Sequence, residues 1–180
     1  MRNEEAMCEG LLSVVIPVYN IRDYVERCVR SVLAQPDVPL EVLIVDDGST
    51  DDSGAVCDAL AAEDSRVTVI HKPNGGPASA SNAGLAAATG DYIGFVDSDD
   101  LIEPTLYETL YSAIKAHEAE GCRIAACGAE GMSESGQPLE GAWFRIRYLG
   151  GTSGTGGTVV GEYRTSSNGT IVVTGLKAGT

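Results

Sequence analysis

Apolar and polar residues follow one another in blocks that predict a strand and then a helix at the start of the chain. Residues 11–16, LLSVVI, form a continuous apolar run that ends at Pro17, as expected of a buried parallel strand. The segment 20–36 places its apolar residues at helical spacing, with Asn20 as the expected N-cap and Pro36 as the stop. The residues on this apolar face are Ile21, Tyr24, Val25, Cys28, Val29, Val32 and Leu33.

The alternation of strands and helices continues to about residue 128. The further predicted elements are strands 40–47, 66–71 and 91–97, helices 53–63 and 75–90, a helix opened by Pro104, and a candidate fifth strand over 122–127. Such alternation over short connections predicts an α/β fold, with a mostly parallel sheet and right-handed crossovers. Ligands of these sheets bind beyond the carboxyl ends of the strands.

The three later predicted helices differ in the side chains with which they can pack. Val56 and Leu60 are expected to point inward from helix 53–63, and Leu106, Leu110 and Ile114 recur at helical spacing after Pro104. The segment 75–90, GGPASASNAGLAAATG, is built from small residues. It can therefore lie close against a sheet, because no bulky side chain holds it away.

The pattern changes after about residue 128, where helical periodicity ends and Gly and Thr become frequent. AWFRIRYLGG, TVVGEYRT and GTIVVTGL read as short strands separated by turns. The predicted organisation is a tail over 1–10, an α/β domain over 11–128, a linker over 129–136 and an incomplete all-β segment over 137–180.

Composition narrows the class of protein. The net charge of −14, from 26 acidic against 12 basic residues, argues against a nucleic-acid partner, which needs clustered Lys and Arg. No apolar run approaches the roughly 20 residues of a transmembrane segment, and the acidic N-terminus is unlike a secretory signal, so a cytoplasmic location is expected. Cys28 and Cys57 fall on apolar helix faces and are predicted to be buried, reduced thiols.

Acidic residues gather at two predicted strand ends, Asp46–Asp47 and Asp97–Asp100. Two carboxylates about 5 Å apart at an effective dielectric near 20 repel each other by roughly 3 kcal/mol. Either water or a cation must offset this repulsion, and Mg²⁺ or Mn²⁺ is commonly held by one or two carboxylates together with substrate phosphates. A calcium loop of the EF-hand type lacks its Gly and closing Glu, and neither G-x-G-x-x-G nor a P-loop motif occurs; the Gly-rich run 150–157 has no Lys.

Four motifs resemble those of a family 2 glycosyltransferase with the GT-A fold, a Rossmann-like α/β fold. They are SVVIPVYN (13–20), VDDGSTDDS (45–53), HKPNGGPASASNAGL (71–85) and GDYIGFVDSDD (90–100), in the order and spacing of the family. The resemblance covers the nucleotide-binding half. It implies inverting transfer of a sugar from a nucleotide donor, with a UDP-sugar expected, to a hydroxyl of a saccharide or other acceptor.

The resemblance also implies roles for individual residues. Pro17 and Tyr19 would lie near the base and ribose, and Asp47 would accept a hydrogen bond from the base. Asp97–Asp99, DSD, matches the DXD motif. In that motif Asp99 would bind a divalent cation, Mg²⁺ or Mn²⁺. Asp97 would help to hold the ribose or the water shell of the metal. Ser98, between them, is expected to contact the nucleotide sugar.

Two departures from the family leave the activity open. Ser81 stands where relatives commonly carry a basic residue near the diphosphate, and no His, Asp or Glu after residue 128 matches the general base of the acceptor-binding half. A missing general base typically costs 10²–10⁴-fold in rate. The alternative to an enzyme is therefore a catalytically incomplete nucleotide-binding remnant, or a fragment of a surface-protein stalk.

Residues 136–146, GQPLEGAWFRI, and 163–180, YRTSSNGTIVVTGLKAGT, resemble parts of a Cna-B-like (SpaA-like) surface-protein domain, a prealbumin-like β-sandwich. In that family an internal Lys–Asn isopeptide bond is common, but none is expected here because no suitably placed Lys precedes Gly136. The joining of a cytoplasmic transferase to an exported stalk module suggests a truncated or recombined reading frame.

Overall fold

The computed structural model describes residues 10–116, 119 and 125, and the backbone of 143–148 and 158–164. The chain divides into two compact units, Met1–Ala125 and Ala126–Thr180. Each unit is described by itself.

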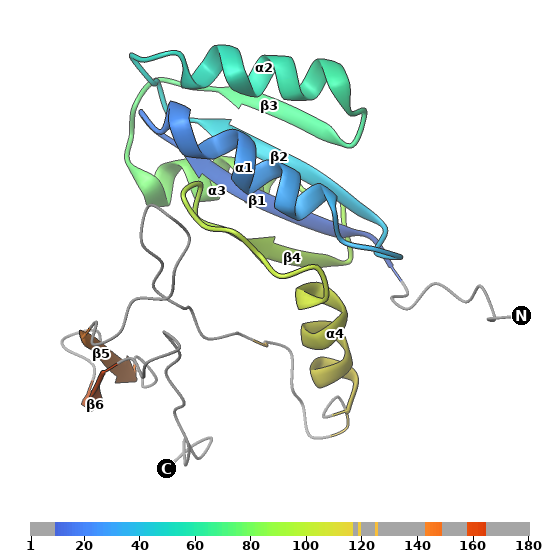
Figure 1. The fold of residues 1–180 in the computed structure, drawn as a ribbon, viewed down its shortest axis with the longest axis vertical. Helices are drawn as coiled ribbons and strands as arrows, with labels where there is room; N and C mark the ends of the chain where they lie inside the picture. Colours follow the sequence, from blue (N-terminus) through green and yellow to red (C-terminus); the bar gives the residue numbers. More distant parts are fainter. Residues whose placement is uncertain (1–9, 117–118, 120–124, 126–142, 149–157, 165–180) are drawn as a thin grey trace, which may run out of the picture. The chain divides into compact units, whose positions relative to one another are not determined.

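The first unit is built on a four-stranded parallel sheet of order β3-β2-β1-β4 (Figure 1). Every strand is followed by a helix, so the predicted α/β fold with a parallel sheet is confirmed. The elements in chain order are β1 (Leu12–Val18), α1 (Arg22–Leu33), β2 (Leu40–Asp46), α2 (Ser53–Glu63), β3 (Val67–His71), α3 (Pro77–Ala87), β4 (Tyr92–Phe95) and α4 (Leu106–Ala116).

The sheet has an apolar core on each face. On one face Val14, Ile16 and their neighbours pack with α1, α2 and Tyr107 of α4. On the other face Val15 and Leu43 pack against Ala80 of α3, and Figure 1 shows α3 behind the sheet with α1 and α2 in front of it. The central strands are therefore covered on both sides, which explains why β1 and β2 read as continuous apolar runs.

The helix of small residues lies close against the sheet, as predicted. Ala80 and Gly84 of α3 are buried. A Cβ atom placed on Gly84 would stand 3.1 Å from Cγ2 of Val15 and nearer still to Cγ1. The distance between α3 and β1 is therefore set by the absence of a side chain at residue 84.

Strand β1 does not end at Pro17, as expected from the sequence, but at Val18. The carbonyl of Val15 accepts a hydrogen bond from Val96 N at 3.2 Å, so the backbone N–H and C=O groups of every second residue of β1 point toward β4. Pro17 faces the same side, but β4 ends at Phe95, opposite Val15. The missing N–H of Pro17 therefore costs no bond of the sheet.

Asn20 is not the N-cap of α1; that position belongs to Ile21, which makes no side-chain capping bond. Asn20 has a positive φ of 51°, and its side chain binds the loop after β2 instead. Tyr24 is also not part of the apolar face, since it is 42% exposed. The other inward positions were predicted correctly: Val25, Cys28, Val29 and Val32 are fully buried, and Ile21 and Leu33 pack against them.

Cys28 and Cys57 are buried and free, as predicted. Burial is the largest cause that raises the pKa of each thiol to about 12, so both keep their protons near neutral pH. Cys8, Cys122 and Cys127 lie outside the described residues. Within the described part of the chain, no helix is long and apolar enough to cross a membrane.

In the second unit, β5 (Trp143–Tyr148) and β6 (Thr158–Arg164) pair in antiparallel fashion, with an irregularity of register between Ile146 and Arg147. They coincide with two of the three predicted C-terminal strand segments. The third segment, and the candidate strand over 122–127 apart from Ala125, lie outside the described residues.

Candidate functional site

Three loops extend from the carboxyl ends of adjacent strands of the sheet. They follow β1 at Tyr19, β2 at Asp47 and β4 at Val96. Parallel strands bring these ends to one edge, where ligands of α/β sheets bind. This edge is the candidate site. Of the residues implied by the sequence resemblance, Pro17 lies in the last part of β1 and the others lie on the three loops.

Asn20 joins the first two loops. Its Oδ1 accepts hydrogen bonds from the N–H groups of Thr50 at 2.8 Å and Asp51 at 3.4 Å, and its own N–H donates to Ser49 Oγ at 3.1 Å. Asn tolerates the left-handed backbone that this arrangement requires. Sequence reasoning assigned Asn20 to the cap of a helix, and the pairing of the loops replaces that role.

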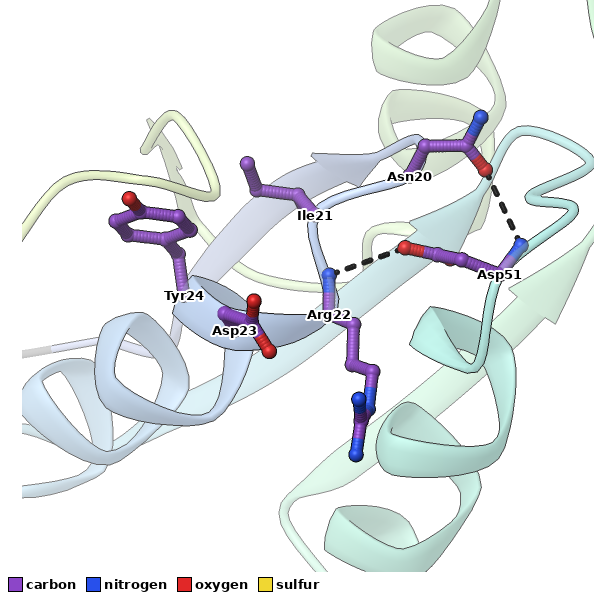
Figure 2. Close-up of a pocket in the computed structure, with 6 residues that line it drawn as sticks. All are labelled: Asn20, Ile21, Arg22, Asp23, Tyr24 and Asp51. Atoms are coloured by element: carbon purple, nitrogen blue, oxygen red, sulfur yellow. Dashed lines mark hydrogen bonds between the residues drawn. The ribbon is translucent and has the colours of Figure 1, made fainter.

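Two further bonds hold these loops together. Ile21 N donates to Ser53 Oγ at 2.9 Å and Arg22 N to Asp51 Oδ2 at 3.4 Å. Figure 2 shows the shallow pocket that results, lined by Asn20, Ile21, Arg22, Asp23, Tyr24 and Asp51. Pro17 is partly buried, whereas Tyr19, directly before Asn20 in the chain, is half exposed.

Asp47 is almost completely buried, with 2% of its surface exposed. Its carboxylate pairs with Lys72 Nζ and accepts the N–H groups of Gly75 at 3.0 Å and Gly76 at 2.7 Å. The bond from Lys72 is the largest cause that lowers the pKa of Asp47, and the two amides lower it further. Asp47 therefore anchors the loop before α3, while its contact with a base stays a prediction.

Lys72, Gly75 and Gly76 were missed as site residues. The signal was present, because a Lys directly after a strand and a Gly pair directly before a helix supply cationic and amide donors. Nζ of Lys72 also donates to the carbonyl of Pro73 at 2.7 Å. Lys72 places a positive charge beside this edge of the sheet, whereas Ser81, the residue that replaces the family's basic side chain, lies partly buried on α3.

Asp46, at the end of β2, belongs to a second ionic cluster. His71 Nδ1 lies 2.9 Å from Asp46 Oδ2, and its Nε2 lies 2.9 Å from Asp58 Oδ1 on α2. Burial acts to raise the pKa of Asp46, but hydrogen bonds from Ser49 and His71 outweigh it and lower the pKa. The pKa of His71 is raised, first by Asp46 and then by Asp58.

The His71 cluster predicts how stability depends on pH. A raised pKa in the folded protein means that protonated His71 stabilises the fold fully below about pH 6.5, the ordinary pKa of histidine, and that this contribution is lost as pH rises through the raised value. Because His71 is half exposed, the change is expected to be about 1 kcal/mol or less. Urea unfolding from about pH 6 to about pH 9 should show this loss in the wild type and not in His71→Gln. Identical pH profiles would show that His71 carries no charge-dependent stability.

The third loop carries the acidic residues. Asp97 and Asp99 are exposed beyond β4, and Ser98 between them is partly buried. The pKa of Asp100 is raised, first by burial and then by the negative charges of Asp99 and Asp97. The carboxylates of this loop therefore share one region of negative potential.

The donor set of the acidic loop fits a hard divalent cation that also binds phosphate. Its exposed donors are carboxylate oxygens, the ligands preferred by Mg²⁺ and Mn²⁺. No group of three or more His, Cys, Asp or Glu side chains among the described residues could hold a metal ion by itself. The arrangement suits a cation held by one or two carboxylates and completed by a ligand.

The parallel α/β sheet with these loops at its carboxyl edge has the GT-A-like fold of the solved structures described below. Residues 13–161 match the family Glycosyl transferase family 2, and the chain belongs to that family. The match extends past residue 137, where the Cna-B-like segment was expected to begin; that resemblance stays a prediction.

Curated relatives agree with the family. The chain is 46% identical over 111 residues to glycosyltransferase GlyG of Streptococcus pneumoniae. This alignment covers 61% of this chain and 37% of GlyG. It is 51% identical over 98 residues to chondroitin synthase of Pasteurella multocida, covering 54% of this chain and 10% of the synthase. The chain thus spans little more than a third of the first relative and a tenth of the second.

Solved structures of the same fold include nucleotide-sugar complexes. Staphylococcus aureus TarS 1–349 in complex with UDP-GlcNAc superposes with a TM-score of 0.53 at 33% identity, over 59% of this chain and 32% of that one. The mannosyltransferase PcManGT of Pyrobaculum calidifontis, in complex with GDP-Man and Mn²⁺, gives a TM-score of 0.54 at 25% identity, over 57% and 32% of the two chains.

Proposed function

We propose that this chain binds a nucleotide sugar at the carboxyl edge of its sheet and acts as a glycosyltransferase, moving the sugar to an acceptor hydroxyl with inversion at the transferred carbon. The observation that carries the proposal is the meeting of three loops at one edge. Tyr19 follows β1, Asp47 follows β2 and Asp97–Asp99 follows β4. Solved relatives of the same fold hold UDP-GlcNAc, UDP and GDP-Man, and a UDP-sugar is the donor we propose.

Each loop contributes a different part of donor binding. Half-exposed Tyr19 would offer an aromatic face to the base or ribose, and Pro17, near the end of β1, would lie close to the same part of the donor. Asp47 holds Lys72 and the amides of Gly75 and Gly76 in place. Each oxygen of this buried carboxylate already accepts two contacts, so the proposed hydrogen bond from the base would replace one of these donors. The acidic loop would face the diphosphate through a cation, since carboxylates alone would repel it.

Asp99 and Asp97 would hold the cation, Mg²⁺ or Mn²⁺, with Ser98 beside the donor. When bound, the cation would neutralise charge on the diphosphate and so stabilise it as a leaving group. The described residues of this edge bind and orient the donor. The proposed acceptor is a hydroxyl compound.

Calorimetric titration tests donor binding directly. UDP added to the full-length chain should bind in the presence of MnCl₂ and bind much more weakly after the metal is removed with EDTA. GDP serves as the comparison nucleotide, since both bases occur among the solved relatives. Failure of both nucleotides to bind a folded chain would overturn the proposal.

Release of UDP from UDP-GlcNAc tests transfer separately from binding. Turnover that rises when saccharide acceptors are added would support a complete transferase. Binding of UDP without any turnover over an acceptor panel would restrict the function to donor binding.

A further inference from the structure

Helix α1 and the residues just after it carry three polar side chains that contact the segment after β4. We call them the α1 polar row: Cys28 and Ser31 lie three residues apart on one side of α1, and Gln35 follows two residues after the end of α1 at Leu33. Their partners are backbone groups between Asp97 and Tyr107, the segment that leads from β4 to α4. The row thus ties the loop that carries the proposed metal ligands to a rigid helix.

Gln35 makes the most central of these contacts. It is 4% exposed although polar. Its Nε2 donates to the carbonyl of Glu103 at 2.8 Å, and its Oε1 accepts the N–H of Tyr107 at 3.3 Å. Both ends of the amide are therefore used by the far end of the loop, and the burial of this polar group is compensated.

Ser31 and Cys28 hold the part of the loop nearer to the carboxylates. Ser31 Oγ accepts the N–H of Ile102 at 3.2 Å and donates to the carbonyl of Cys28 at 2.7 Å. The thiol of Cys28 donates to the carbonyl of Asp97 at 3.4 Å. Asp97 is therefore held through its backbone while its carboxylate stays exposed.

The loop itself has few other fixed backbone bonds. Asp100 N donates to the carbonyl of Asp97 at 3.0 Å, and Leu106 N to that of Glu103 at 3.0 Å, so these two bonds close turns within the loop. At its start, Val96 N binds Val15 O of β1. The α1 polar row links the loop beyond Asp97 to the rest of the unit through hydrogen bonds to Ile102, Glu103 and Tyr107.

We propose that Ser31 and Gln35 are positioning residues for the donor site. They hold the backbone of the acidic loop in the conformation in which Asp97 and Asp99 can bind a cation. This inference rests on the proposed function. A site for a cation gains affinity when its ligands are held in place before binding, because less order must be imposed by the ligand. Loosening the loop should therefore weaken cation affinity without removing a ligand.

Ser31→Ala tests the inference against a matched control. Ser31 is partly buried and Ser13 fully buried. Like Ser31, Ser13 accepts a loop N–H with its Oγ, that of Gly90 at 2.8 Å, and donates one hydrogen bond, to Glu41 Oε1 at 2.6 Å, but it lies near the amino end of β1. Ser31→Ala and Ser13→Ala each remove one hydroxyl and one such bond. Both are expected to lower thermal stability, whereas only Ser31→Ala touches the acidic loop.

Two measurements on the full chain separate the variants. Amide hydrogen exchange over residues 97–107 should accelerate in Ser31→Ala and stay at the wild-type rate in Ser13→Ala. The MnCl₂ concentration that gives half-maximal UDP binding should rise about threefold to tenfold in Ser31→Ala, the effect of one lost hydrogen bond, and stay unchanged in Ser13→Ala. Gln35→Met, which keeps the volume of the buried side chain, should act in the same direction as Ser31→Ala.

The outcomes distinguish this inference from the proposed function. If the wild type binds UDP with MnCl₂ and both serine variants need the same MnCl₂ concentration, the positioning role is overturned and the function stands. If the wild type binds neither UDP nor Mn²⁺, the proposed function fails and the positioning role falls with it. A higher MnCl₂ concentration for half-maximal UDP binding in Ser31→Ala and Gln35→Met, but not in Ser13→Ala, supports the inference.

Discussion

Metal-dependent UDP binding is expected to be lost in the Asp99→Asn variant. Asparagine keeps the shape of the side chain but removes the charge that attracts a divalent cation. Loss of an outer-shell partner alone costs 10–100-fold in metal affinity, so loss of a ligand should cost at least about 100-fold. Calorimetric titration of UDP with MnCl₂ present measures this change, and a change of less than about threefold would contradict the role of Asp99.

Asp91→Asn is the matched control. Asp91 is an exposed carboxylate just before the amino end of β4, and its Oδ2 accepts the N–H of Leu11 at 3.0 Å. The substitution removes the same charge at the opposite end of the same strand. UDP affinity in the presence of MnCl₂ should equal that of the wild type, and an equal loss in both variants would point to a general effect of net charge.

Gly84→Ala is expected to lower the free energy of unfolding by up to about 2 kcal/mol, the balance of overpacking and helix propensity. The added Cβ would stand 3.1 Å from Cγ2 of Val15 and nearer to Cγ1, and Val15 is a fully buried, branched side chain of β1. Overpacking typically costs about 1–3 kcal/mol, while Ala gains about 1 kcal/mol over Gly in a helix. The clash should exceed the gain because neither β1 nor α3 can move freely. Urea unfolding followed by circular dichroism measures the difference.

Two controls separate the clash from helix propensity. Asn82→Ala changes an exposed residue of the same helix and should leave stability unchanged or slightly raised. Val15→Ala removes the atoms that would clash, so it should cost less in the Gly84→Ala background than in the wild type, by at least about 0.5 kcal/mol. Additive effects would show that Gly84 and Val15 do not compete for the same space.

The steric clash caused by Gly84→Ala should also weaken the donor site. Helix α3 begins at Pro77, directly after the glycines whose amides bind Asp47. A shift of α3 away from β1 would disturb this anchor, so Gly84→Ala should bind UDP more weakly as well as unfold more easily.

Much of the fold was predictable because its signals are local. Helix α2 covers the predicted 53–63, since its apolar residues recur with helical spacing. Helix α3 packs close to the sheet because its residues are small, a property visible in GGPASASNAGLAAATG. The acidic strand ends were also predictable, because an apolar run followed at once by carboxylates marks the carboxyl end of a strand. This held for buried β2 and also for β4, in which Ile93 and Phe95 are exposed.

The roles of single residues at the ends of elements were less predictable. Asn20 looked like a helix cap, but its partners, Thr50 and Asp51, are far away in the chain. Pro17 looked like the end of a strand, but β4 stops before it and leaves room for a residue without an N–H. In both cases the deciding neighbour belongs to another element, which periodicity cannot identify.

The sequence by itself determined the order of strands and helices, the apolar core and the motifs of the glycosyltransferase family, because these depend on residues close together in the chain. Only the tertiary structure decided that Asp47 is buried against Lys72 and the glycines before α3, that His71 joins Asp46 to Asp58, and that Ser31 and Gln35 hold the acidic loop. A hydrogen bond depends on distances of a few ångströms between atoms, and in a parallel sheet those distances are set by how distant segments pack.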